Sequence, residues 1–500
     1  PTEDSQRRRF KQRLNYKGSD YKSYSMNYIR DKQQEKEITK IEKTLINEEF
    51  LNSFSEENID ENEDYDDNNN EKLDETDDWC VVDTKNFKDE ETLLTVHCDL
   101  ISMQSVYPGA LDITKTTLYF STDNTSKKIK NKRWKLITLK GIHRRRYLLR
   151  NTALEIFLDT NRSYLFDFKK QEREQVHTLL LNVANNIKDF SKDKTPKSIL
   201  KHSNITQLWK ERKISNFEYI MQLNTIAGRT YNDLSQYPIA PWILTDYKSS
   251  NIDLSNPNIY RDLSKPVGAL NEKRFEEFKI RYENMPSDDP TMPRFLYGSH
   301  YSTALVVLYY LIRMEPFTKQ YLELQGRFDH ADRMFDSIET AFYNSYSLSQ
   351  DVKELIPEFF YNPDFFYNYN ELDLGTRQGN DKPINHVKMP PWASTPEEFV
   401  RIHKEALESD IVSENLHKWI DLIFGYKQRG KEAHKANNLF YYLTYEGAVN
   451  IDAIEDPILR NATIEQIISF GQTPTQLFTK PHPQRNINND NSISIINNPE

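Results

Sequence analysis

The stretch NFEYIMQLNTIAGRTYNDLSQYP, residues Asn216–Pro238, runs into an apolar segment, Tyr237–Leu244, that is too hydrophobic for a solvent-exposed loop. We expect this segment to be extended peptide in a protein core, where every backbone N–H and C=O group needs a partner. Polar side chains of the first stretch are suited to that task, because buried irregular backbone is satisfied by side chains. The residues predicted to do so are Asn224, Arg229, Tyr231, Asn232 and Asp233.

The chain around this stretch, residues 200–483, is mainly helical in pattern. Asp456 followed by Pro457 is a strong helix start, and Gly471 lies where that helix is expected to stop. Another helix presents an apolar face that ends at Gly425, formed by Leu416, Trp419, Ile420 and Ile423. The sequence therefore predicts a helical domain whose core also contains extended segments.

Residues 90–190 have a different pattern. Short runs rich in branched and aromatic residues predict strands, and Pro108-Gly109 predicts a turn between two of them. The expected strands are Thr92–Cys98, Thr117–Ser121, Ala153–Asp159 and Ser163–Phe168. A helical period follows over 176–187. Short antiparallel strands closed by one C-terminal helix are typical of a PH-like β-barrel, although the pattern also allows other small β-barrels. The fold class is thus multi-domain α+β.

Charge and cysteine content narrow the function classes. The net charge of −10 disfavours nucleic-acid binding, and 13 acidic residues against one basic residue lie in the single run Glu56–Asp78. Residues 1–78 are expected to be disordered or weakly helical and to end in this acidic linker, and 484–500 are expected to be a disordered Asn-rich tail. Two cysteines, Cys80 and Cys98, cannot build a disulfide framework, which favours a reducing compartment.

A series of blocks along residues 204–483 resembles the BEACH domain family. Besides the opening stretch, it includes RDLSKPVGAL (261–270), GSHYSTA (298–304), GRFDHADRMF (326–335), MPPWA (389–393) and FGQTPTQLF (470–478). Upstream, VYPGALDITKTTLYF (106–120) and HRRRYLLRNTALEIFL (143–158) resemble the PH-like domain that precedes BEACH. These sequence blocks are similar to those of both the neurobeachin and the large-volume-sphere branches of the family.

The resemblance implies a PH-like domain packed against a mostly helical BEACH domain, with a groove between them. It also implies a non-catalytic scaffold in vesicle and membrane traffic, including lysosome-related, fusion or fission and autophagy processes, without a cofactor. The expected location is cytoplasmic, peripherally associated with endomembranes, and the expected partner is a protein at the PH–BEACH surface. WD40 repeats are expected downstream in the full-length protein.

A basic stretch, residues 127–150, holds 11 Lys or Arg and no acid. Arg144, Arg145, Arg146 and Arg150 are predicted to serve domain docking or partner binding. A cluster on the expected loop is the candidate for phosphoinositide or anionic-membrane binding, since each such residue contributes about 1 kcal/mol near an anionic surface; it comprises Lys127, Lys128, Lys130, Lys132 and Arg133. A solvated surface, or pairing with the acidic linker, are the alternatives.

No catalytic or metal-binding constellation is found in the sequence. It has neither a GxSxG elbow nor a phosphate-binding P-loop. His330 lies between Asp329 and Asp332, and this is the only observation in the sequence that suggests a hydrolase activity. Metal sites need several ligands at fixed spacing, which these residues do not provide. We therefore expect His330 to form local bonds near a helix N-terminus, with no catalytic residue, metal or cofactor.

Overall fold

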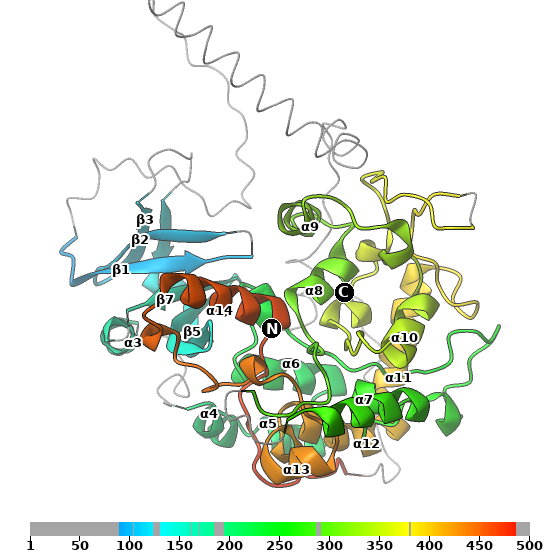
Figure 1. Cartoon of the computed structure of the whole chain (residues 1–500). Helices are drawn as coiled ribbons and strands as arrows, with labels where there is room; N and C mark the ends of the chain where they lie inside the picture. The colour runs from blue at the N-terminus through cyan, green and yellow to red at the C-terminus, as the bar shows by residue number, and fades with distance from the viewer. Residues whose placement is uncertain are drawn as a thin grey trace, which may run out of the picture.

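The computed structural model describes residues 90–103, 105–123, 131–160, 162–169, 171–184, 195–286, 292–379 and 382–486. The predicted segment 1–78 and the loop lysines Lys127, Lys128 and Lys130 lie outside these residues. Most of the predicted tail, residues 487–500, also lies outside them. Figure 1 shows a curled sheet on the left, hereafter the barrel, and a larger helical domain from residue 195 onward.

Seven antiparallel strands form the barrel in the order β4-β3-β2-β1-β7-β6-β5. Their bounds are β1 Leu94–Ile101, β2 Val106–Ile113, β3 Thr117–Thr122, β4 Lys132–Lys135, β5 Leu139–Tyr147, β6 Arg150–Leu158 and β7 Ser163–Phe168. The helix α3, Glu172–Val183, follows and buries Val176 and Leu180 against the barrel core. Aromatic rings fill this core, with Phe166 5.8 Å from both Phe120 and Trp134 between ring centroids. The predicted fold class is confirmed.

One predicted turn is wrong. Pro108 and Gly109 lie inside β2, and the turn comes earlier, where the Ser102 N–H bonds the Ser105 carbonyl. Gly109 is needed for close packing and not for a bend, because a Cβ there would lie 2.1 Å from the Ser121 carbonyl oxygen. Pro108, which has no N–H, is tolerated because it lies just beyond the last Cα pair of β2 and β3, Gly109 with Thr122.

The helical domain is built from short helices linked by 3₁₀ turns and extended segments. Its helices are α4 Pro196–Ser203, α5 Ile205–Lys210, α6 Asn216–Ile226, α7 Glu272–Asn284, α8 Ala304–Leu311, α9 Phe317–Gln325, α10 Ile338–Ser347, α11 Pro396–Glu408, α12 Asp410–Ile423, α13 Gly430–Lys435 and α14 Pro457–Phe470. The predicted start and stop of α14 are confirmed: the Asp456 side chain accepts from Ile458 N–H, and Gly471 follows the last helical residue with a φ of 79°.

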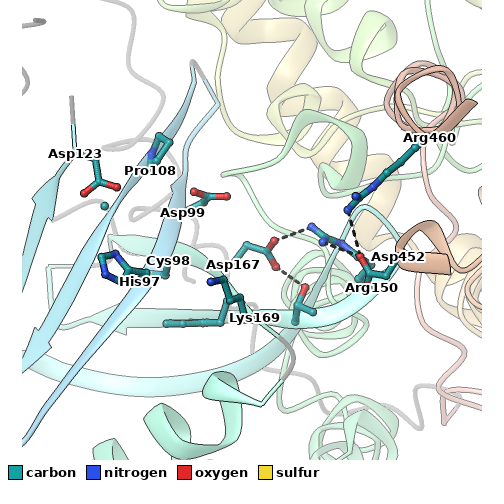
Figure 2. Close-up of a pocket in the computed structure, with 13 residues that line it drawn as sticks. His97, Cys98, Asp99, Pro108, Asp123, Arg150, Asp167, Lys169, Asp452 and Arg460 are labelled. Atoms are coloured by element: carbon teal, nitrogen blue, oxygen red, sulfur yellow. Dashed lines mark hydrogen bonds and ion pairs between the residues drawn. The ribbon is translucent and has the colours of Figure 1, made fainter. Parts of the chain in front are cut away.

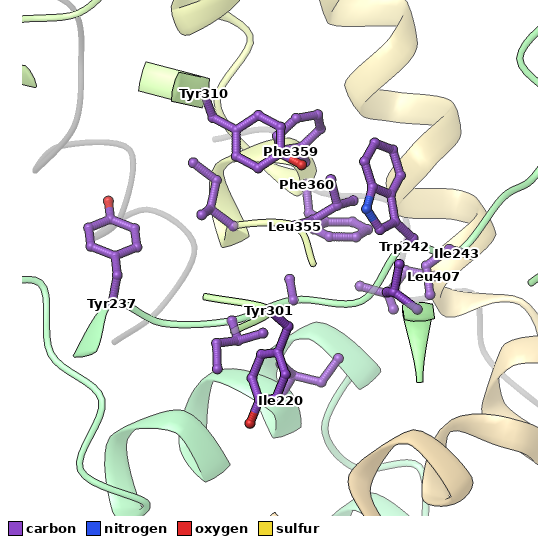
Figure 3. Close-up of a cluster of buried hydrophobic side chains, with 14 of the residues drawn as sticks. Ile220, Tyr237, Trp242, Ile243, Tyr301, Tyr310, Leu355, Phe359, Phe360 and Leu407 are labelled. Atoms are coloured by element: carbon purple, nitrogen blue, oxygen red, sulfur yellow. The ribbon is translucent and has the colours of Figure 1, made fainter. Parts of the chain in front are cut away.

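Extended peptide runs through the helical core as the sequence predicts. Every residue of Tyr237–Leu244 is buried, and Figure 3 shows Tyr237 and Trp242 on this segment among the rings and aliphatic side chains of the core. The Asn224 side chain acts as a backbone substitute here, since it accepts from the Ile239 N–H and donates to the Ile239 carbonyl, both at 2.9 Å. A helix side chain thereby satisfies peptide groups that have no strand partner.

Order continues into the predicted tail. Arg485 is buried, and its guanidinium donates to the Trp209 and Ile214 carbonyls and to the side chains of Asn216 and Ser413. Four acceptors from three different segments hold the chain here, although its composition resembles a polar tail. The structural domain therefore extends at least to residue 486.

Candidate functional site: the interface of barrel and helical domain

The outer face of β7 is buried, and so is the middle of the outer face of β6. Alternation along β6 places Leu154, Ile156 and Leu158 in the barrel core, yet Ala153 and Glu155 of the opposite face are also buried. Ala153 belongs to a separate apolar cluster with Ile101 and Leu165, against which Tyr147 packs. The helical domain covers this face, so the interface, and not the barrel alone, excludes water from these strands.

Glu155 is the polar centre of the interface and is only 1% exposed. Inside the barrel its carboxylate ion-pairs with Arg145 at 2.7 Å and accepts from Ser163 at 2.8 Å. From the helical domain, Thr230 donates at 2.7 Å and Asn232 at 3.1 Å. A buried ion pair is stable only when its remaining lone pairs are bonded, and here the second domain supplies those bonds.

The hairpin between β5 and β6 forms the apolar part of the contact. Its two turn residues, Leu148 and Leu149, have φ values of 47° and 61°, a left-handed conformation that usually requires Asn or Gly. Left-handed backbone costs about 1–2 kcal/mol for such a residue. Both side chains are buried with Leu443, Ile451 and Ile467 of the helical domain, so their burial offsets the strain of the turn.

Next to the hairpin, Arg146 and Gln472 join the two backbones. The buried Arg146 guanidinium donates to the Thr473 carbonyl at 3.1 Å and lies 3.4 Å from the Glu446 carboxylate. Burial lowers the pKa of Arg146. The Gln472 side chain accepts from Leu149 N–H at 3.4 Å and donates to the Ser235 hydroxyl at 2.7 Å. These bonds fix the hairpin tip against the residues that follow α14.

The other predicted docking arginines divide between the domains. Arg150 contacts both, lying 2.8 Å from Asp167 of the barrel and 3.4 Å from Asp452 of the helical domain. Arg144 stays within the barrel, where it pairs with Glu174 of α3 at 2.7 Å. The structure thus brings Arg145, Arg146 and Arg150 to the interface and leaves Arg144 outside it.

Two predicted lipid-binding residues fall among the described residues. Lys132 is buried, with its ammonium 4.7 Å from the centre of the Tyr164 ring, because alternation along β4 turns it inward. That position keeps the Lys132 ammonium away from a lipid surface. Arg133 is exposed on the outer face and lies over Tyr119 at 5.4 Å.

The polar residues predicted to bond buried backbone groups lie on the helical side of the interface. Arg229 is buried and donates to the Tyr237 carbonyl at 2.8 Å, the Gln472 carbonyl at 2.5 Å and the Ser302 hydroxyl at 2.7 Å. Burial lowers the pKa of Arg229 to about 10. Asp233 accepts from Ser235 and Gln236, and Tyr231 packs edge-on against Tyr237 at 5.1 Å. Asn232, by contrast, bonds across the interface.

At one edge of the interface lies a polar cavity of about 450 Å³. Figure 2 shows the ion pairs that cross it, from Asp167 through Arg150 to Asp452, and from Asp452 to Arg460 at 3.6 Å. Asp99 faces Asp167 across the β1–β7 pairing, and burial raises the pKa of both carboxyls. Salt bridges thus line this edge of the interface between the barrel and the helical domain.

At the opposite edge lies an apolar groove of about 360 Å³ between the two domains. The barrel contributes the β1–β2 turn and the end of β5, and the helical domain contributes η4 (Leu234–Gln236), α8, α9 and the end of α14. Its apolar lining includes Ile101, Met103, Val106, Leu234, Leu308, Leu324 and Ile468. Its charged lining residues are Asp233 and Glu323, and no Lys or Arg is among the described lining residues.

The catalytic candidate His330 lies away from the interface, before the 3₁₀ turn Ala331–Arg333, and its N–H bonds the Asp329 carboxylate at 2.7 Å. In the described part of the chain, no three His, Cys, Asp or Glu side chains are grouped to hold a metal ion. None of the described helices combines the length and apolarity that a membrane crossing requires.

The sequence prediction missed the residues that make the interface specific: Glu155, Leu148, Leu149 and Gln472. Glu155 carried no signal, because a carboxylate between Leu154 and Ile156 fits the ordinary alternation of a strand whose outer face is solvated. The Leu148-Leu149 turn carried none, since two-residue hairpins are recognised by Asn-Gly or Asp-Gly. Spatial pairing across 323 residues, as between Leu149 and Gln472, leaves no local pattern.

The barrel, the helical domain with its extended core and the buried contact between them define a PH–BEACH module. Residues 207–485 match the family model "Beige/BEACH domain", and residues 98–181 match "PH domain associated with Beige/BEACH". The chain belongs to the BEACH family, and the barrel is its PH-like domain.

Two curated relatives match over 72% of this chain. "BEACH domain-containing protein B" of Arabidopsis thaliana is 49% identical over 375 residues, and "BEACH domain-containing protein lvsD" of Dictyostelium discoideum is 48% identical over 390. The matches cover only 14% and 13% of those proteins' lengths. A solved structure, the C-terminal domain of an unknown protein from Leishmania infantum, aligns with 19% of this chain and 83% of that chain. Its identity is 18% and its TM-score 0.17, too low to bear on the fold.

Proposed function

We propose that the PH-like barrel and the helical BEACH domain work as one non-catalytic scaffold unit in membrane traffic, with a protein partner held in the apolar groove. The observation that carries this proposal is the buried charge of Glu155, whose bonds come from both domains. A shift of one domain that removed these donors and kept water out would strand this charge, at a cost of several kcal/mol. Family membership supports the trafficking role.

The groove has the chemistry of a protein-binding site. Exposed apolar side chains gather on it from both domains: Leu324 of α9 is 52% exposed and Val106 of β2 is 44% exposed. A groove of this size suits two or three apolar side chains of a partner, and its wholly acidic charged lining favours a segment that also carries a Lys or Arg.

A buried polar atom in the groove also calls for a partner. Gln320 of α9 donates its amide to the Met103 carbonyl of the β1–β2 turn, which ties the two walls of the groove together. Its amide oxygen is buried and has no hydrogen-bond partner among the described residues. A bound segment reaches this oxygen only if the Gln320 side chain turns toward the groove, where a backbone N–H of the segment would then satisfy it.

The wider role is proposed from family membership. The module would act in the cytoplasm at the surface of endomembranes, in vesicle, lysosome-related, fusion or fission and autophagy processes, with WD40 repeats downstream. Anionic-membrane binding through the basic loop stays an alternative. Among the described residues it draws only on Arg133, since Lys132 is turned into the barrel.

The test compares two leucines of similar exposure. Leu324→Gln places an amide in the groove, and Leu459→Gln places one on α14 outside the groove lining, where Leu459 is 56% exposed. Both substitutions lie on the surface, so neither should cost more than about 0.5 kcal/mol of stability. The full chain and both variants are used to enrich partners from cell extract, with quantitative mass spectrometry as the readout.

The proposal predicts a set of proteins that is captured by the wild type and by Leu459→Gln but is lost with Leu324→Gln. Equal capture by all three chains would contradict a partner in the groove. Loss with both variants would show that the effect does not depend on the groove and would contradict it equally.

A further inference from the structure

A cluster of aromatic rings lies on the helical domain away from the groove, in the loop residues 364–386, which are yellow on the right of Figure 1. The rings of Tyr367 and Tyr369 are stacked, with centroids 4.9 Å apart and planes 18° from parallel. His386 meets Tyr367 edge-on at 5.4 Å and 77°. Tyr369 is 47% exposed, so the ring face turned away from Tyr367 is available to a ligand.

Carboxylates surround these rings. The Tyr367 hydroxyl donates to both oxygens of Glu397, at 2.9 and 3.2 Å. Glu397 lies in the first turn of α11, and Arg401 one turn later pairs instead with Glu398 and Glu405. Arg401 therefore leaves the Glu397 carboxylate to the Tyr367 hydroxyl.

The Glu397 and Asp364 carboxylates act electrostatically on both tyrosines. Burial raises the pKa of Tyr367 to about 12, with further contributions from the Glu397 and Asp364 carboxylates. After burial, the same two carboxylates raise the pKa of Tyr369. Each carboxylate thus disfavours a second negative charge at the rings and, by the same interaction, favours a positive charge there.

The cluster is held in place before any ligand arrives. The Asn368 N–H donates to Nδ1 of His386 at 2.9 Å, which fixes the imidazole, and Glu397 fixes Tyr367. Side chains that are already ordered lose little rotamer entropy on binding. An exposed aromatic residue by itself needs no explanation, but a stacked, anchored pair beside two carboxylates is a prepared surface for a cation.

We propose that the tyrosine surface, formed by Asp364, Tyr367, Tyr369, His386 and Glu397, binds an arginine-bearing segment of a partner protein. A guanidinium stacks flat on an aromatic ring and pairs with a carboxylate through its N–H fork, which a lysine ammonium cannot do in the same way. This surface is separate from the groove, so the proposal does not depend on the proposed function.

The probe is the peptide acetyl-Ala-Arg-Ala amide, titrated against the full chain and followed by saturation-transfer NMR. Two matched peptides carry lysine, and citrulline, which keeps the planar shape without the charge. The expected order of affinity is arginine, then lysine, then citrulline. Equal binding of the arginine and citrulline peptides would overturn the proposal.

Four variants locate the binding. Tyr369→Leu and Glu397→Gln should each weaken binding of the arginine peptide by about two- to five-fold, the range of an exposed cation–π contact. Tyr369→Phe, which keeps the ring, and Tyr343→Leu, at a tyrosine of α10 that is 56% exposed, should bind as the wild type does. Unchanged binding by Tyr369→Leu, or an equal loss with Tyr343→Leu, would overturn the proposal.

A lipid is the competing ligand, since a choline headgroup also stacks on aromatic rings. Phosphatidylcholine vesicles are therefore floated with the wild type and Tyr369→Leu. No flotation of either chain is expected. Flotation that Tyr369→Leu abolishes, without binding of the arginine peptide, would assign the surface to a lipid and overturn the proposal.

Discussion

The hydroxyl of Thr230 donates a hydrogen bond of 2.7 Å to the carboxylate of Glu155, and this bond joins the helical domain to the barrel. Glu155 already pairs with Arg145 inside the barrel, so the bond completes the solvation of a buried charge. A carboxylate with an unmet lone pair in a dry interface is costly, and the two domains therefore stabilise each other through one side chain.

Thr230→Val tests this bond, because valine keeps the shape of threonine and removes the hydroxyl, which also accepts from the Asn232 N–H at 3.1 Å. The Glu155 oxygen keeps Ser163 and Asn232 as donors, so the loss is that of one hydrogen bond to a charged group, about 1.5–3 kcal/mol. The loss should appear on both sides of the interface, as faster hydrogen exchange in β6 of the barrel and in α6 of the helical domain. Thr225→Val is the matched control, since the Thr225 hydroxyl bonds only the Met221 carbonyl of its own helix. Equal exchange in both variants would contradict the assigned role of Thr230.

The left-handed backbone at Leu149 predicts that alanine and glycine substitutions there have the reverse of their usual order of stability. Leu149→Ala and Leu149→Gly both lose the buried side chain, but only glycine is relieved of the strain at a φ of 61°. Glycine should therefore be more stable than alanine here by about 1 kcal/mol. At Leu118 in β3, where the backbone is ordinary strand, alanine should be the more stable. Urea unfolding of the four variants checks both orders.

Glu358 predicts a pH dependence of the free energy of unfolding. Burial raises its pKa to about 7, and the hydroxyls of Tyr237 and Tyr361, at 2.6 and 3.1 Å, offset this only in part. The folded state holds this proton more tightly than the unfolded state. The contribution is therefore full below pH 4.5 and is lost as pH rises to about 7, amounting to roughly 3 kcal/mol.

Glu358→Gln isolates this effect. The buried histidines act in the opposite direction, since burial lowers the pKa of His300 and His482 to about 3 and of His403 to about 4. Their contribution is present above pH 6.5 and is lost on acidification. The difference in unfolding free energy between wild type and variant should therefore fall between pH 5 and 7.5. A difference that stays constant with pH would show that Glu358 does not titrate in this range.

Local patterns in the sequence determined much of the fold. The bounds of β7 and of α14 follow from alternation and from the Asp456, Pro457 and Gly471 signals, which act within a few residues. The buried extended segment was also predictable, because its composition is incompatible with solvent. Pro108-Gly109 misled because a turn signal and a close-packing requirement select the same residue types.

The interface was predictable only in part. The basic stretch indicated where the domains meet. Arg146 of the barrel contacts Thr473 and Glu446 of the helical domain, and Arg150 contacts Asp452. The partner of each charge depends on which strand face the second domain covers, and one sequence does not contain that information. Arg144 differs from Arg145 by a single position, yet alternation turns it to Glu174 of its own domain.

The most direct test of the central claim, that barrel and helical domain are one unit, is whether they unfold together. Hydrogen exchange along a urea gradient follows β6 (Arg150–Leu158) and α6 (Asn216–Ile226) in the same sample. We predict one shared midpoint, which Thr230→Val lowers equally in both elements. Two separated midpoints, with the barrel strands opening first and unaffected by Thr230→Val, would contradict the account.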